Sequence, residues 1–111
     1  MKTLTFTVLK DKLLDRSKKQ TFRCLFIPKF EIGEMVGLTY KENGEKEYLY
    51  NVYITELYPK QIKDFTLEEA KRDGFESIQA FKKEIMTLNR LKSENQWGFI
   101  IRWHPCQTVV K

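Results

Sequence analysis

Hydrophobic and polar residues alternate at the start of the chain. Over residues 3–9, Leu4, Phe6 and Val8 fall on one side and threonines on the other. A period of two with β-branched residues predicts a strand with one buried face. Residues 11–18 then predict a short helix held against the core by two adjacent leucines, because so short a helix is not stable alone.

A second strand is predicted over residues 21–27, and it ends at the proline that follows. Successive side chains of a strand point to opposite faces. Thr21 and Arg23 are therefore expected to share one face, and Phe22 and Cys24 the other.

A β-hairpin is predicted in the middle of the chain. Two strand-like runs, residues 34–41 and 46–58, are joined through Glu42-Asn43-Gly44. Asn and Gly both tolerate positive φ, so Asn-Gly between two such runs is a strong hairpin signal. Pro59 is expected to close the second strand, because proline has no N–H to donate to a ladder.

Two helices are predicted next. Thr66 and Glu69 have the spacing of a capping box, and Gly74 follows as a stop. Ser77 then caps a longer helix. Its apolar residues recur at spacings of 3, 4 and 3, which places them on one stripe facing the core: Ile78, Phe81, Ile85 and Leu88.

The chain closes on further β structure. Residues 97–103 predict a strand with Phe99, Ile101 and Trp103 on one face, and residues 107–110 a short final strand. The helices lie between β segments without regular alternation, which disfavours a doubly wound parallel sheet. We expect an α+β fold: a small, mixed or antiparallel β-barrel with a short helix after the first strand and two helices before the last strands.

Composition narrows the class of protein. Of the 111 residues, 41% are hydrophobic and 14% aromatic, which supports one compact domain over residues 1–111 and excludes a disordered chain. No apolar run approaches the roughly 18 residues of a membrane helix, and the N-terminus lacks the features of a signal peptide. We therefore expect a cytoplasmic protein without a membrane partner.

The sequence holds two cysteines and one histidine. Cys24 and Cys106 lie far apart, and reduced thiols are the default in the cytosol. No Cys or His pair has the spacing of metal ligands, so we expect neither a metal nor another cofactor. His104 could form a nucleophilic pair with a cysteine, although burial is the commoner fate of a lone cysteine.

Positive charge is concentrated near the N-terminus. The formal net charge is +5, and residues 10–23 alone carry +4, with two acidic residues against six basic ones: Lys10, Lys12, Arg16, Lys18, Lys19 and Arg23. Such a patch attracts anions, most commonly phosphate backbones; a solvated helix face is the simpler alternative. Residues 60–96 carry eight basic and seven acidic side chains, a balance that predicts an ordinary solvated surface.

Residues 16–23, Arg-Ser-Lys-Lys-Gln-Thr-Phe-Arg, resemble the signature of the ASCH family: glycine, any residue, lysine, two residues, threonine, any residue, arginine. Lys18, Thr21 and Arg23 match this signature, and Arg16 stands at the glycine position. The turn, helices and closing strand that follow also resemble the family, so the resemblance covers nearly the whole chain. It implies a PUA-like barrel with a cleft that faces RNA, a nucleotide or a modified nucleoside.

The resemblance implies a binding site in this segment, formed by Arg16, Lys18, Lys19, Thr21 and Arg23. An arginine such as Arg23 can pair a phosphate bidentately, or form an ion pair within the protein. Exposed aromatic side chains could stack an unpaired base; Tyr53 and Trp103 are candidates, although core packing is the commoner role of such residues.

The resemblance also implies a possible reaction, because one branch of the family is similar to small amidohydrolases that deacetylate acetylcytidine with a Lys, a Thr and a Glu. A Thr21 hydroxyl becomes a nucleophile only if a base removes its proton. Lys18 could act as that base if burial and neighbouring cations lowered its pKa. The position of the glutamate falls on or beside Gly74, and the nearby carboxylates are Asp73, Glu76 and Glu68.

Three functions therefore remain open. The first is a module that binds RNA or a nucleotide through the basic signature, and the second is an amidohydrolase acting on a modified nucleoside. The third is a protein-interaction domain whose basic segment docks an acidic partner. The oligomeric state is not predicted.

Overall fold

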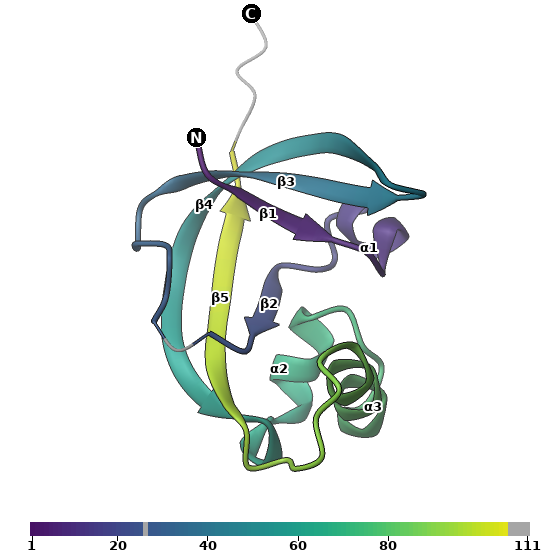
Figure 1. Ribbon diagram of the computed structural model, residues 1–111. Helices are drawn as coiled ribbons and strands as arrows, with labels where there is room; N and C mark the ends of the chain where they lie inside the picture. Colours follow the sequence, from purple (N-terminus) through teal and green to yellow (C-terminus); the bar gives the residue numbers. More distant parts are fainter. Residues whose placement is uncertain (26, 107–111) are drawn as a thin grey trace, which may run out of the picture.

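The computed structural model describes residues 1–25 and 27–106. Its core is one curled five-stranded sheet with helices beside it (Figure 1). The elements in chain order are β1 (Thr3–Phe6), α1 (Lys10–Leu14), β2 (Gln20–Arg23), β3 (Met35–Glu42), β4 (Glu45–Gln61), the 3₁₀ turn η1 (Ile62–Asp64), α2 (Leu67–Arg72), α3 (Ile78–Leu88) and β5 (Trp97–Pro105).

The sheet is mixed, with the strand order β1-β3-β4-β5-β2. β1 pairs with β3 in parallel, and every other pairing is antiparallel. The first and last strands of this order do not pair with each other, so the curled sheet is a half-barrel with one open side. The fold is therefore the expected α+β architecture, with a short helix after the first strand and two helices before β5.

The long strand β4 joins the two halves of the sheet, and it corrects one expectation. Pro59 does not close the strand, which continues to Gln61. β3 pairs with β4 only as far as Tyr53, whereas Pro59 lies opposite Phe99 of β5. One edge of β4 is therefore free of β3 at the proline, and a strand edge tolerates a residue that has no N–H.

The first strand and helix are shorter than expected. β1 stops at Phe6, and α1 covers Lys10–Leu14 rather than residues 11–18. Arg16 has a positive φ of 66°, which no right-handed helix accommodates. Of the two leucines expected to anchor this helix, Leu13 is fully buried but Leu14 is 53% exposed.

The local signals of turns and caps are confirmed. Asn43 and Gly44 both adopt positive φ, at 52° and 81°, in the turn between β3 and β4. Thr66 and Glu69 form the reciprocal capping box of α2, and the Ser77 side chain accepts a hydrogen bond from the first turn of α3. The strand expected over residues 107–110 lies outside the described residues.

Two hydrophobic cores lie on either side of β5, because Ile100 and Ile101 point in opposite directions and are both fully buried. Ile101 belongs to the core enclosed by the curled sheet, together with Trp103 and Leu13. Ile100 belongs to the core between β2, β5 and the helices, which contains Phe22 and Phe81. No helix in the described part of the chain is both long and apolar enough to cross a membrane.

Candidate functional site

The Lys18 side chain is buried at the junction between the two cores, with 3% of its surface exposed. After α1, the chain turns back so that the Lys18 N–H donates to the Lys12 carbonyl. Its ammonium donates to the Asp73 carboxylate at 2.5 Å and to the Asp73 backbone carbonyl at 2.6 Å. Asp73, the residue that ends α2, is 2% exposed. A sequence separation of 55 residues is thus closed by a buried ion pair.

Thr21 and Arg23 lie on one face of β2, as the alternation predicts. The Arg23 Nε donates to the Thr21 hydroxyl at 3.2 Å, and one Arg23 Nη donates to the Thr5 carbonyl at 3.0 Å. The guanidinium also lies 4.8 Å from the centre of the Phe6 ring, a favourable cation–π arrangement. Phe22 points the other way, into the helical core.

A cavity of about 150 Å³ is lined by Lys18, Thr21, Arg23 and Asp73. We call it the signature cavity. Its other walls are mainly apolar and come from β1, β2, α3 and the segment between α2 and α3, including Phe6, Phe75, Ile85 and Leu88. A largely apolar wall with a few convergent polar groups is typical of small-ligand sites.

Burial governs the electrostatics of the pair. Burial lowers the pKa of Lys18 and raises the pKa of Asp73, and in each case the opposite charge of the other residue opposes this effect. Both shifts favour the neutral forms. The proton of the pair is therefore shared more evenly between amine and carboxylate than it would be in water.

Gln20 connects this pair to the outer surface of the sheet, a role that the sequence did not reveal. The side chain is fully buried. Its amide nitrogen donates to the Glu69 carbonyl at 3.0 Å and to the second Asp73 carboxylate oxygen at 3.3 Å. Its amide oxygen accepts from the Arg102 Nε at 3.0 Å. The position of this polar amide between the matching signature residues Lys18 and Thr21 was the one available sign.

The remaining candidate residues lie elsewhere. The Arg16 guanidinium lies over the Tyr50 ring, 4.1 Å from its centre, and Lys19 lines a different cavity. Of the three candidate carboxylates only Asp73 lines the signature cavity; Glu68 pairs with Arg72, and Glu76 lies at the surface.

The aromatic residues considered for base stacking do not line the signature cavity, and of the two cysteines only Cys24 does. Trp103 is 3% exposed and packs in the sheet core, so its face is not open to a base, whereas Tyr53 is 46% exposed. Both cysteines are free thiols; Cys24 lines the signature cavity, and burial raises its pKa. Among residues 1–25 and 27–106, no three His, Cys, Asp or Glu side chains gather as metal ligands do.

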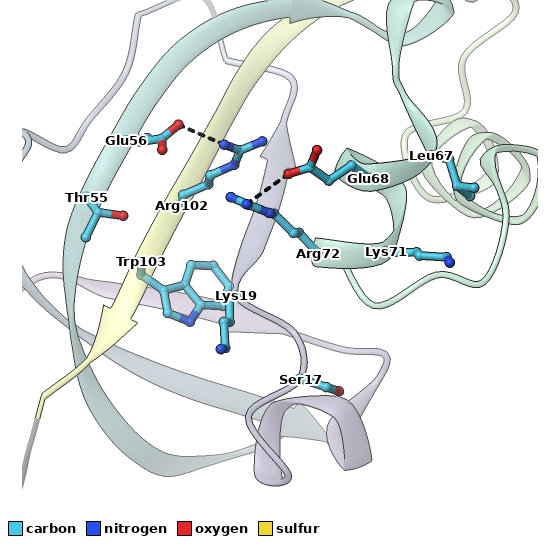
Figure 2. Close-up of a pocket in the computed structure, with 10 residues that line it drawn as sticks. All are labelled: Ser17, Lys19, Thr55, Glu56, Leu67, Glu68, Lys71, Arg72, Arg102 and Trp103. Carbon is cyan, nitrogen blue, oxygen red and sulfur yellow. Dashed lines mark hydrogen bonds and ion pairs between the residues drawn. The ribbon is translucent and has the colours of Figure 1, made fainter.

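A second, larger cavity of about 700 Å³ lies on the outer side of β5 and α2, and we call it the outer cavity (Figure 2). Figure 2 shows Arg102 from β5 and Arg72 from α2 pointing toward the same space, with Glu56 and Glu68 as their ion-pair partners. It is lined by Ser17, Lys19, Thr55, Glu56, Leu67, Glu68, Lys71, Arg72, Arg102 and Trp103.

The fold is similar to solved structures of known families. A crystal structure of an ASCH domain from Lactobacillus crispatus superposes with a TM-score of 0.62 at 12% identity, over 94% of this chain and 79% of that one. This chain has the ASCH-domain fold. The structure of an Enterococcus faecalis protein described by the family model DUF984 matches with a TM-score of 0.61 at 13% identity, over 86% of this chain and 67% of that one. No protein-family model and no curated protein matches the sequence.

The backbone conformation of Arg16 is the one that a glycine adopts most easily. Arg16 occupies the glycine position and has a positive φ of 66°. Glycine adopts this left-handed conformation freely, whereas for another residue it costs about 1–2 kcal/mol. The stacking of the Arg16 guanidinium on Tyr50 offsets part of this cost. The positive φ of Arg16 thus shapes the turn that precedes Lys18.

Proposed function

We propose that the chain binds an RNA nucleotide or a free nucleotide, with one base or phosphate held in the signature cavity. Two of the five N–H donors of Arg23 are used by Thr21 and Thr5. The others, with the Thr21 hydroxyl, can hydrogen-bond a polar ligand edge. The volume of about 150 Å³ is below the roughly 300–1,000 Å³ of pockets for drug-sized ligands. It suits one group of a nucleotide rather than the whole.

The observation that carries this proposal is the buried Lys18–Asp73 pair in the cavity wall. Removing two charges from water costs several kcal/mol per ion, and apolar residues of the same size often stabilise a protein as well or better. A pair of this kind in a cavity wall is therefore a candidate functional group, because ionisable side chains with perturbed pKa values concentrate at functional sites.

Ligand titration tests the proposal. Nucleosides, nucleotides and short RNAs are titrated into the wild type, Arg23→Gln and the control Arg90→Gln. Arg90 is exposed and makes no ion pair with any described residue. Binding that is weakened about tenfold or more by Arg23→Gln and unchanged by Arg90→Gln supports the proposal. Equal affinities for all three proteins refute it.

A second candidate is an amidohydrolase acting on an acetylated nucleoside such as acetylcytidine, and Asp73 favours it. The carboxylate that such chemistry needs beside the amine stands 2.5 Å from the Lys18 Nζ. Neutral Lys18 would take the Thr21 hydroxyl proton as the oxygen attacks the acetyl carbon, and pass it to the departing amine. Water would then hydrolyse the Thr21 ester and release acetate.

Chromatography of the reaction products decides between binding and hydrolysis. If the chain is the enzyme, the wild type releases cytidine and acetate from acetylcytidine, and Thr21→Val does not, although its circular dichroism spectrum shows that it is folded. Binding of acetylcytidine by both proteins without any cytidine leaves the binding function and excludes this reaction.

A further inference from the structure

The outer cavity concentrates positive charge from parts of the chain that are far apart in sequence. Lys19 precedes β2, Lys71 and Arg72 lie on α2, and Arg102 lies on β5 (Figure 2). Against these four cations stand two carboxylates, Glu56 and Glu68, so the lining carries a net charge of +2. A backbone hydrogen bond of 2.9 Å from the Lys19 N–H to the Arg72 carbonyl holds the segment before β2 against the end of α2.

The cations of this cavity are open to an anionic ligand. Among the described residues, Lys19 and Lys71 form no ion pair. Arg72 pairs with Glu68, and their side chains are 45% and 71% exposed; Arg102 pairs with Glu56, and their side chains are 14% and 49% exposed. Exposed ion pairs contribute only about 0–1 kcal/mol. A phosphate group can therefore replace the Glu68 carboxylate beside Arg72 at little cost.

An unsatisfied donor lies in the wall of the same cavity. The Trp103 indole nitrogen is buried, and it has no hydrogen-bond partner among the described residues. Buried polar atoms without a partner are rare, and each costs about 1–3 kcal/mol. An acceptor oxygen from a ligand in the outer cavity, reached by a small movement of the indole, would satisfy it.

A third cavity borders both the outer cavity and the signature cavity. This middle cavity of about 410 Å³ shares Ser17 and Lys71 with the outer cavity and shares Phe75 with the signature cavity. Lys12 lines the middle cavity as a further cation, against Glu76. Three neighbouring cavities lined by basic side chains therefore follow one another from Arg102, past α2 and α1, to the buried Lys18–Asp73 pair, and we call this series the path.

We propose that this path binds the phosphodiester backbone of a single-stranded RNA whose base occupies the signature cavity. The inference rests on the proposed function, because it assigns the nucleotide in that cavity to a longer strand. An RNA strand supplies both a base for the apolar signature cavity and phosphates for Lys19, Lys71, Arg72 and Arg102. An acidic peptide supplies negative charges for these side chains but no base for the signature cavity.

Length dependence tests the path. Mononucleotides and oligoribonucleotides of up to about ten nucleotides are titrated into the wild type, the double variant Lys19→Ala/Lys71→Ala and the control Lys83→Ala/Lys92→Ala. The control removes two exposed lysines that line none of the three cavities. We expect affinity to rise with length in the wild type and the control. The Lys19→Ala/Lys71→Ala variant should keep its mononucleotide affinity and lose most of this gain.

The salt dependence of binding measures how many phosphate contacts the two lysines make. Each phosphate contact of a single strand contributes about −0.7 to the slope of log K against log salt concentration. Loss of two contacts should therefore flatten the slope by about 1.4 in the Lys19→Ala/Lys71→Ala variant. An unchanged slope in this variant overturns the proposal, and so does polyglutamate binding with the same affinity and the same dependence on the two lysines.

An NMR measurement separates this proposal from the proposed function. The chain has two indole N–H resonances, and Trp97→Phe assigns the one of Trp103. The oligonucleotide should shift the Trp103 resonance in the wild type but not in Lys19→Ala/Lys71→Ala. If Arg23→Gln leaves mononucleotide binding intact while the lysine variant still loses the length gain, the proposed function fails and the backbone path stands. If Arg23→Gln weakens mononucleotide binding while the Lys19→Ala/Lys71→Ala variant keeps the full gain with length, the proposed function stands and the backbone path alone is overturned.

Discussion

Replacing Asp73 by Asn isolates the charge of the buried pair, because Asn keeps the size of the side chain and its carbonyl acceptor. Lys18 is then left with no counter-charge at a site where it is 3% exposed. Breaking a buried pair by removing one partner costs about 3–5 kcal/mol. The penalty has an upper limit, because Lys18 can release its proton. From its ordinary pKa of 10.5, neutralisation at pH 7 costs about 4.8 kcal/mol, at about 1.36 kcal/mol per pH unit.

The pH dependence distinguishes this cause from loss of packing. In the wild type, the pair holds one proton whether it resides on Lys18 or Asp73, and the unfolded chain also holds one on these two groups near neutral pH. The pair therefore adds no pH dependence to the free energy of unfolding near neutral pH. In Asp73→Asn, the negative charge that opposed the effect of burial is gone, so the pKa of Lys18 falls further. Where Lys18 is neutral in the folded state, the unfolded state binds a proton that the folded state lacks. Stability then rises with pH between the folded-state pKa and 10.5.

Urea unfolding of the wild type and Asp73→Asn between about pH 6 and pH 9 measures the difference. We expect Asp73→Asn to be about 3–5 kcal/mol less stable at pH 7 and to regain about 1.36 kcal/mol per pH unit where Lys18 is neutral in the folded state. The double variant Lys18→Met/Asp73→Leu should match or exceed the wild type in stability and lose nucleotide binding. A loss below about 1 kcal/mol that is constant with pH would refute the reasoning.

Three further predictions test individual features of the fold. Thr66→Ala should lower the free energy of unfolding by about 1 kcal/mol, measured by urea denaturation, because it removes the cap of α2; an unchanged midpoint contradicts this. Gly98→Ala should lower the free energy of unfolding by about 1–3 kcal/mol, because a Cβ would lie 2.4 Å from the Phe22 ring and 2.6 Å from a backbone oxygen of β2; an unchanged urea midpoint contradicts this. Alkylation of Cys24, followed by mass spectrometry, should be slow at neutral pH and accelerate above the ordinary thiol pKa of 9.0, because burial raises its pKa; a reaction as fast as that of a free thiol at pH 7 contradicts it.

Neighbouring side chains of the segment 16–23 point to two different sites, the buried Lys18–Asp73 pair and the outer cavity. Lys18 points inward to Asp73, whereas Lys19 lines the outer cavity. Gln20 links the two sides, because it hydrogen-bonds both Asp73 and Arg102. A ligand that engages Arg102 therefore acts on a side chain that is two hydrogen bonds, through Gln20, from the Lys18–Asp73 pair.

The features that the sequence determined by itself depend on neighbours within a few residues. The turn at Asn43-Gly44, the capping box of Thr66 and Glu69, and the alternation that places Thr21 and Arg23 on one face follow from local backbone geometry. The same holds for the element order, from which the half-barrel class could be predicted. Local rules were wrong at Pro59, where the free edge of β4 made the missing N–H harmless.

Only the tertiary structure decided which groups meet. Asp73 was one of three equivalent carboxylates in the sequence, and it alone contacts Lys18, across 55 residues. Arg102 and Gln20 meet across 82 residues. The balanced charge of residues 60–96 predicted an ordinary surface, yet α2 brings Lys71 and Arg72 beside Lys19 and Arg102. Each contact depends on how α2 and β5 pack against β2, and such packing is set by burial of the shared core rather than by any pattern along the chain.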